Sequence, residues 1–126
     1  MLVKSFNLRA GGDVSQYALL MQDSSNRTDQ AVVTTGITSI PIAISTIDVD
    51  VSVDGGDALK YEKLEIGHLY TVIASTTVAV DAPLGCAADG EVVTATSGQA
   101  YYFIACQAGV ANQVMQARYV GYQTVA

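Results

Sequence analysis

The clearest pattern along the chain is a strict alternation of apolar and polar residues between positions 47 and 53. The apolar positions are Ile47, Val49, Val51 and Val53, and the polar positions between them are Asp48, Asp50 and Ser52. Successive side chains of a β-strand point to opposite faces, so this pattern predicts a half-buried strand. The sequence Asp-Gly-Gly-Asp at residues 54–57 then predicts a turn.

Similar apolar segments recur along the chain and are separated by short turns that contain glycine. We expect further strands at residues 31–35, 37–44, 69–74, 77–80, 91–96, 100–106 and 113–120. Short strands at this spacing predict an all-β fold, as a small β-barrel or a sandwich-like domain, because a parallel sheet would need long helical crossovers. One short helix is expected at residues 58–66, with Asp57 as its N-cap and Gly67 as its end.

The first thirty residues differ from the remainder, because they are polar and turn-rich around one apolar patch at residues 17–21. We predict an extended N-terminal arm over residues 1–30 and a β-rich domain over residues 31–126. The alternative for the arm is a first strand packed onto the domain. The side chains that we expect to be buried are those of Val49, Val51, Val72, Ile73, Val93, Phe103, Ile104 and Met115.

Composition narrows the possible partners. Half of the 126 residues are apolar and only 14% are charged, with six Lys and Arg against twelve Asp and Glu. A formal charge of −6 with no run of basic residues argues against direct nucleic acid binding. No apolar stretch reaches the about 18 residues of a membrane-spanning helix, and the N-terminus lacks a secretory pattern, so we expect no membrane partner.

Candidate catalytic residues are few. His68 is the single histidine, and no serine lies in a Gly-x-Ser-x-Gly motif, so we do not expect an enzyme. Cys86 and Cys106 stand twenty positions apart and form no metal-binding pair, so we expect buried, reduced and unliganded thiols. The alternative is a disulfide between two strands. We therefore predict no catalytic residues, no cofactor and no structural metal.

An acidic cluster, formed by Asp48, Asp50, Asp54 and Asp57, begins like a calcium-binding loop. The match then fails, because Val53 stands where that loop needs glycine and no glutamate occupies the twelfth position. The alternation already explains these residues as the solvated face of a strand. Whether they bind a cation is left open.

The densest aromatic group is Tyr101, Tyr102 and Phe103. On a strand, Tyr101 and Phe103 would point to one face and Tyr102 to the other. Rings on both faces fit a strand that is covered by the core on one side and by a neighbouring subunit on the other, although a rim tyrosine would give the same pattern. These three residues are our candidate subunit contact.

The C-terminal half has a recurring order of motifs. Small residues precede Gly85, Asp89 and Gly90 form a predicted hairpin turn, and a valine-rich strand, an aromatic strand and a final aliphatic strand follow. In this order residues 69–120 resemble the head decoration, or cement, proteins of tailed bacteriophages. Cys106 and Gln107 depart from the pattern, because small residues are usual there.

The resemblance implies a β-rich domain, commonly trimeric, that binds the outside of an assembled capsid and stabilises it without catalysis. We therefore expect a structural virion protein on the capsid exterior, assembled in the host cytoplasm. Its expected partners are the major capsid protein, gripped by residues 1–30, and two further copies of itself in a homotrimer. The alternative is a receptor- or glycan-binding module of a virion fibre or cell surface, which would use exposed tyrosines among Tyr17, Tyr61, Tyr70, Tyr119 and Tyr122.

Overall fold

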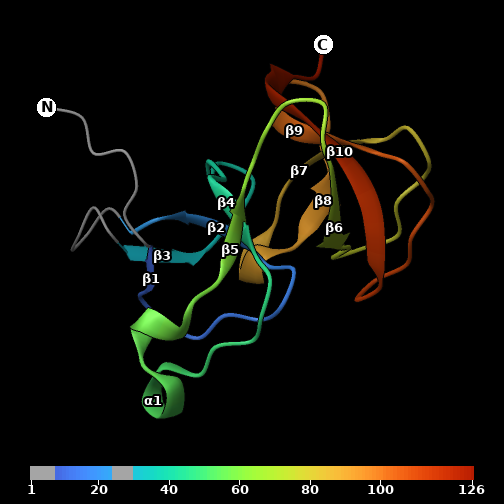
Figure 1. Ribbon diagram of the computed structural model, residues 1–126. Coiled ribbons are helices and arrows are strands. Elements are labelled where there is room, and N and C mark those ends of the chain that lie inside the picture. Colours follow the sequence, from blue (N-terminus) through green and yellow to red (C-terminus); the bar gives the residue numbers. More distant parts are fainter. Residues whose placement is uncertain (1–7, 24–29) are drawn as a thin grey trace, which may run out of the picture.

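The computed structural model describes residues 8–23 and 30–126, and its strands form two five-stranded sheets (Figure 1). In spatial order, the first sheet consists of β1 (Arg9–Ala10), β3 (Gln30–Val33), β2 (Leu19–Gln22), β4 (Ala43–Ser45) and β5 (Tyr61–Lys63). The second sheet consists of β6 (Leu69–Ile73), β10 (Val114–Thr124), β9 (Ala100–Ala105), β7 (Pro83–Cys86) and β8 (Val92–Thr94). The predicted all-β class is confirmed.

Within residues 8–23 and 30–126, helical structure is limited to single turns. Helix α1 spans Val51–Asp54, and two 3₁₀ turns span Gly56–Ala58 (η1) and Ala88–Gly90 (η2). Neighbouring strands run antiparallel except for the short pair β1 and β3, which is parallel.

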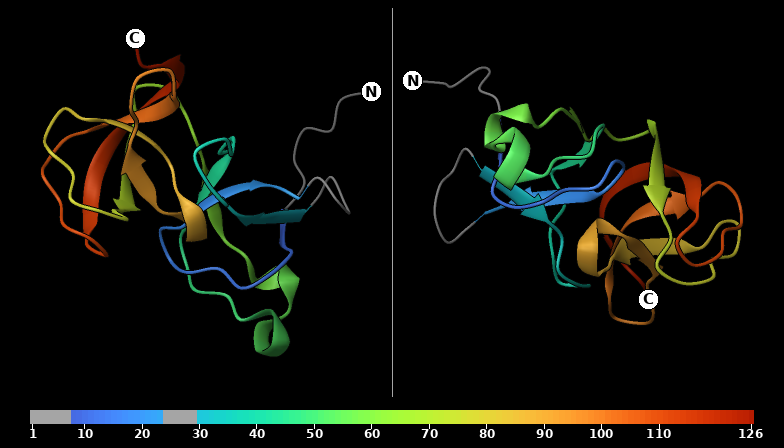
Figure 2. Two further views of the ribbon diagram at one scale, coloured as in Figure 1. Left: turned by 180° about the vertical axis from the view of Figure 1, so that it is seen from behind. Right: turned by 90° about the horizontal axis from the view of Figure 1, so that it is seen from below.

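The second sheet curls into a half-barrel around its own apolar face (Figure 2). A bridge between Ala74 and Val92 brings the end of β6 against β8, which narrows the open side of the curl. Phe103 lies fully buried in this core, and its ring meets Tyr70 and Tyr119 nearly edge-on, at centroid distances of 6.4 and 5.3 Å. Edge-to-face contact is a favourable geometry for aromatic rings and orients these three side chains.

Strands β2 and β4 contribute side chains to two separate cores. Leu19 and its cross-strand neighbour Ile44 join the core of the half-barrel. Leu20 and Ala43 follow the same pairing but belong to a second core. The buried partners in that second core are Ala10, Val14, Ala18, Ala31, Val49 and Leu59. Because side chains alternate along a strand, the first sheet is covered on one face by the half-barrel and on the other by its own connecting loops.

The two sheets meet where the turn η2 packs on the backbone of the first sheet. The hydroxyl of Thr34 donates a hydrogen bond to the carbonyl of Ala87 (2.9 Å), and the N–H of Gly90 donates to the carbonyl of Thr34 (3.2 Å). Thr34 and Gly90 are buried and Ala87 is half-buried, so water has little access to these two bonds. Gly90 has a φ of 75°, and a Cβ there would lie 2.6 Å from the Cβ of Ala18. The contact therefore requires glycine for both space and backbone conformation.

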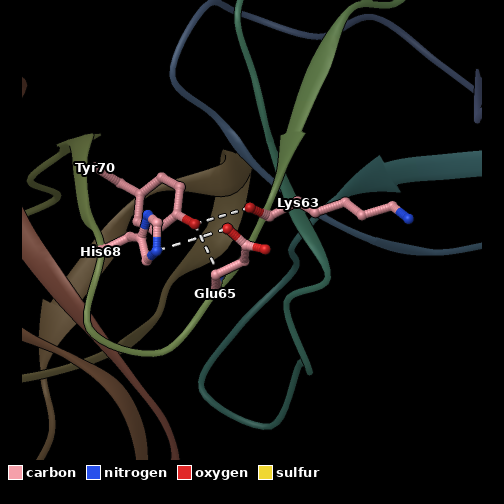
Figure 3. A network of polar contacts seen from close by, with 4 residues as sticks. All are labelled: Lys63, Glu65, His68 and Tyr70. Carbon is pink, nitrogen blue, oxygen red and sulfur yellow. Dashed lines mark hydrogen bonds and ion pairs between the residues drawn. The ribbon is translucent and has the colours of Figure 1, made fainter.

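The connection from β5 to β6 is held by the side chain of Tyr70 (Figure 3). The Tyr70 hydroxyl donates to the carbonyl of Lys63 (2.8 Å) and accepts from the backbone N–H of Glu65 (2.7 Å). The same connection is tied to β10, because the N–H of Gly67 donates to the carbonyl of Tyr119 (2.9 Å). The segment that links the two sheets is thus anchored at both of its ends.

The strand predicted at residues 47–53 is wrong, and the segment contributes an isolated bridge at Val49 instead. Val49 is buried and bridges Val14, whereas Val51 begins helix α1 and is half-buried, and Val53 is 78% exposed. The carboxylate of Asp50 accepts hydrogen bonds from the N–H and the hydroxyl of Ser52 and caps the helix. Aspartate side chains that bond nearby backbone in this way compete with extended pairing.

The helix predicted at residues 58–66 is also wrong. Tyr61–Lys63 form β5 instead and pair with β4, where Ile44 lies opposite Glu62. The capping aspartate was a weak signal, because pairing with a neighbouring strand overrides local helix preference.

The other strand predictions are confirmed in part. Strands at residues 69–74, 91–96, 100–106 and 113–120 correspond to β6, β8, β9 and β10. The segment 37–44 is mostly loop, and residues 77–80 form only an isolated bridge from Val78 to Gly109. Of the expected core, the buried members are Val49, Val72, Phe103 and Met115, and the half-buried members are Val51, Ile73, Val93 and Ile104.

The described part of the predicted N-terminal arm, residues 8–23, supplies two strands of the first sheet. β2 pairs with both β3 and β4, and its residue Leu19 is fully buried. This arrangement corresponds to the alternative of a strand packed onto the domain, and the expected boundary between residues 30 and 31 falls inside β3. Residues 1–7 and 24–29 of that segment lie outside the described residues.

We predict that Gly90→Ala destabilises the protein more than Gly98→Ala does. Both glycines have positive φ, which costs an L-residue about 1–2 kcal/mol, but the space around Gly98 is open. The added methyl at Gly90 must also displace Ala18, which adds about 1–3 kcal/mol of overpacking. Urea denaturation measures both variants, and equal losses of stability would show that the contact between the sheets is loose.

We predict that Tyr70→Phe lowers the free energy of unfolding by about 1–3 kcal/mol, because the Lys63 carbonyl and the Glu65 N–H lose their partner at a part-buried site. Tyr122→Phe is the matched control, since Tyr122 is 67% exposed and should lose little. Thermal unfolding followed by circular dichroism compares the two. An unchanged melting temperature for Tyr70→Phe would mean that water replaces the hydroxyl at no cost.

Candidate interaction surfaces

The predicted aromatic contact, Tyr101, Tyr102 and Phe103, lies on β9 and is covered mainly by the chain itself. Tyr102 and Phe103 are 3% and 0% exposed, while Tyr101 is half-buried. The ring of Tyr102 packs at 5.9 Å from that of Tyr122, and burial raises the pKa of the Tyr102 hydroxyl. Each face of β9 thus carries side chains that are buried within one chain, and contact of these residues with a second subunit stays a prediction.

Beside Tyr102 lies an exposed surface without any charged residue, which we call the neutral face. Two adjoining hollows, of about 360 and 420 Å³, form this face. Eight residues line the first hollow and seven line the second, and Thr38 and Ile40 line both. Its lining residues are Met21, Gln22, Thr35, Ile37, Thr38, Ser39, Ile40, Ile42, Gly98, Gln99, Ala100, Tyr102 and Tyr122. Ile40 is 65% exposed and Tyr122 is 67% exposed, so large apolar groups face solvent here.

The neutral face was missed by the sequence analysis, although the sequence carries a signal for it. Residues 30–47 and 92–117 contain no Asp, Glu, Lys or Arg. The fold brings parts of these two stretches together, since the loop between β3 and β4 meets β9 and the end of β10. Uncharged stretches far apart in the sequence can thus indicate a shared surface.

A separate hollow, of about 680 Å³, is acidic. Asp13, Asp48, Asp50, Asp54 and Asp89 line it, together with Val14, Val33 and Val49. The prediction that Asp48 and Asp50 are solvated is confirmed, but they lie on a loop and a helix cap instead of a strand.

The aspartates of this hollow bond to nearby backbone. Asp13 accepts from the N–H of Val51 (3.1 Å), Asp48 from the N–H of Gln16 (2.7 Å) and Asp54 from the N–H of Asp50 (3.2 Å). Hydrogen bonds from Ser52 lower the pKa of Asp50. Among residues 8–23 and 30–126, no three acidic, histidine or cysteine side chains come together as a metal site. The carboxylates therefore hold the loops around α1 in place.

His68 lies on the exposed connection between β5 and β6. Its Nε2 is 3.7 Å from the Oε1 of Glu65, and both side chains are more than 60% exposed (Figure 3). A general base is commonly held in a cleft beside the group that it deprotonates, and this position offers open solvent.

No helix in the part of the chain that the structure describes is long and apolar enough to cross a membrane.

The two cysteines differ in their surroundings. Cys86 is fully buried in the half-barrel, as expected, and burial raises the pKa of its thiol to about 12. Cys106 is exposed, because it follows β9 at the start of a turn. The expectation that both cysteines are buried is therefore wrong for Cys106. Both thiols are free in the structure.

We predict that one thiol per chain reacts rapidly with Ellman's reagent at pH 8 and that the second reacts only in denaturant. Cys106 is accessible, whereas burial keeps Cys86 protonated. Because the pKa of Cys86 is raised on folding, protonated Cys86 favours the folded state below about pH 9, and this contribution is lost as the pH rises toward 12. Cys106→Ser should remove the fast phase, and two fast thiols in the native protein would contradict the burial of Cys86.

No protein-family model matches the chain, and no curated protein sequence matches it. Its structure is similar to the crystal structure of the head fiber gp8.5 N base of bacteriophage phi29, with a TM-score of 0.72 and 23% sequence identity. The match covers 90% of this chain and 91% of that one. The two proteins therefore share a fold over almost their whole length.

Proposed function

We propose that this chain is a structural protein of a phage head and that it attaches to the outside of the assembled capsid. The observation that carries the proposal is the fold shared with the base of a phage head fiber, which extends over 90% of this chain. The resemblance of residues 69–120 to capsid decoration proteins points to the same particle on different grounds, since it rests on sequence motifs. A fold alone does not define a function, so the proposal needs its own test.

Within this proposal the chain acts as a decoration protein that stabilises the shell by contact and performs no reaction. The polar side chains of the acidic hollow support this role, because they cap backbone groups of their own chain. The partner is the major capsid protein, and the chain assembles as a homotrimer. Several weak contacts made together by linked copies hold a lattice more tightly than each contact would alone.

The second candidate, a receptor- or glycan-binding module, gains less support from the tyrosines that would serve it. Tyr70 is buried, and Tyr17, Tyr61 and Tyr119 are half-buried. Only Tyr122 among the five presents a largely exposed ring. Sugar recognition through aromatic stacking would need a broader platform than this one ring.

The structure also changes how capsid attachment should be tested. Removal of residues 1–23 would delete β1 and β2, and with them the fully buried side chains of Leu19 and Leu20. Such a truncation would lose capsid binding through unfolding, whatever the role of the N-terminal segment. The test therefore uses the full chain.

We predict that the purified chain co-sediments with capsids that lack it, saturates at a fixed number of copies per capsid, and raises the temperature at which those capsids break. Capsids that already carry the protein are the matched control, because their sites are filled. Binding without any gain in capsid stability would favour a fibre base over a cement protein. Failure to bind bare capsids, together with specific binding to glycans or host cells, would favour the second candidate.

A further inference from the structure

Charge is unevenly distributed over this protein. The chain carries a formal charge of −6, and five aspartates surround the acidic hollow beside α1. None of the thirteen residues that line the neutral face is charged. Three exposed large apolar side chains, Ile40, Ile42 and Tyr122, lie together on this surface, which also lacks carboxylates. Apolar patches of this kind on small soluble proteins commonly mark contact surfaces.

The neutral face is held in shape by its own chain. The hydroxyl of Ser39 accepts hydrogen bonds from the backbone N–H groups of Thr35 (3.0 Å) and Gly36 (3.3 Å), which closes the loop that carries Ile40. Ile37, in the same loop, packs directly over the backbone of Gly85, where a Cβ would lie 2.5 Å from its Cδ1. A partner that binds here would therefore spend little free energy on ordering the surface.

We propose that the neutral face is the surface through which copies of this chain pack against one another. Two acidic copies repel each other, and burial of a carboxylate in their contact would need a basic partner group. The neutral face lets them meet with no such group. A basic partner would instead be attracted to the acidic hollow and would gain nothing from an uncharged surface.

The inference rests on the homotrimer within the proposed function and adds its contact surface. Stable interfaces use about 20–30 residues a side, and the thirteen lining residues provide the uncharged centre of such an interface. The predicted contact residue Tyr102 forms part of this surface, through the hollow that it shares with Tyr122. The proposed subunit contact thus lies mainly on the loop between β3 and β4 and on the end of β10, rather than on β9 itself.

We predict that Ile40→Glu and Ile40→Lys both weaken self-association by about tenfold or more, since each would bury a charge in an apolar contact. Light scattering on the full chain measures the mass, which should be a multiple of 13.2 kDa for the unchanged protein and shift toward 13.2 kDa for both variants. Val53→Glu is the matched control, because Val53 is 78% exposed on α1, away from the neutral face, and this variant should still associate. Circular dichroism verifies folding, and Thr38→Glu, at another exposed position of the face, serves as a second variant.

The inference is overturned if the unchanged chain is monomeric at about 100 µM, a hundredfold above a micromolar dissociation constant. It is also overturned if Ile40→Glu associates normally. Association of Ile40→Lys without association of Ile40→Glu would overturn it too, since the neutral face would then contact an acidic surface. Capsid co-sedimentation separates this inference from the proposed function. A monomeric Ile40→Glu that still binds capsids leaves attachment intact, and an associating chain that binds no capsid leaves the neutral face intact.

Discussion

The architecture depends on one close contact, the packing of the η2 turn against the strands of the first sheet. Gly90 approaches Ala18 so closely that any side chain would collide, and Thr34 exchanges hydrogen bonds with the backbone on both sides of the turn. Hydrogen bonds between buried groups are costly to break, because neither partner can turn to water. This contact sets the distance between the sheets and so determines which side chains can fill the space between them.

That distance lets the first sheet complete the core of the second. The half-barrel encloses Phe103 and its neighbours, and Leu19 and Ile44 pack into the same core from β2 and β4. The fold shared with the phi29 head fiber base covers both sheets, which agrees with a single unit of two interdependent parts. The loop of the neutral face belongs to the first sheet, yet Ile37 packs over Gly85 of the second, so this surface also requires the joined sheets.

The sequence predicted secondary structure well where strands pair with neighbours that are near in the chain. It was misleading where contacts with distant residues determine whether a segment forms a strand or a helix. Strands β6, β8, β9 and β10 could be predicted, since each has enough apolar or β-branched residues to define its pairing. Strand β7 (Pro83–Cys86) was missed, because its proline and glycine are typical of a turn. The alternation at residues 47–53 failed because only Val49 is paired there, in an isolated bridge to Val14, and the Asp50 cap starts helix α1 directly afterwards. The neutral face could not be located without the fold, although its uncharged stretches are visible in the sequence.

The opposite orientation of Leu19 and Leu20 on β2 affects how the chain folds during its synthesis. Leu20 packs against residues from the first half of the chain, whereas Leu19 packs against residues such as Leu84 and Phe103, which are synthesised much later. During translation the first sheet would therefore expose one apolar face until β7 and β9 have left the ribosome. The first sheet can therefore complete its packing only after β9 has emerged, and this apolar face stays open to other contacts until then.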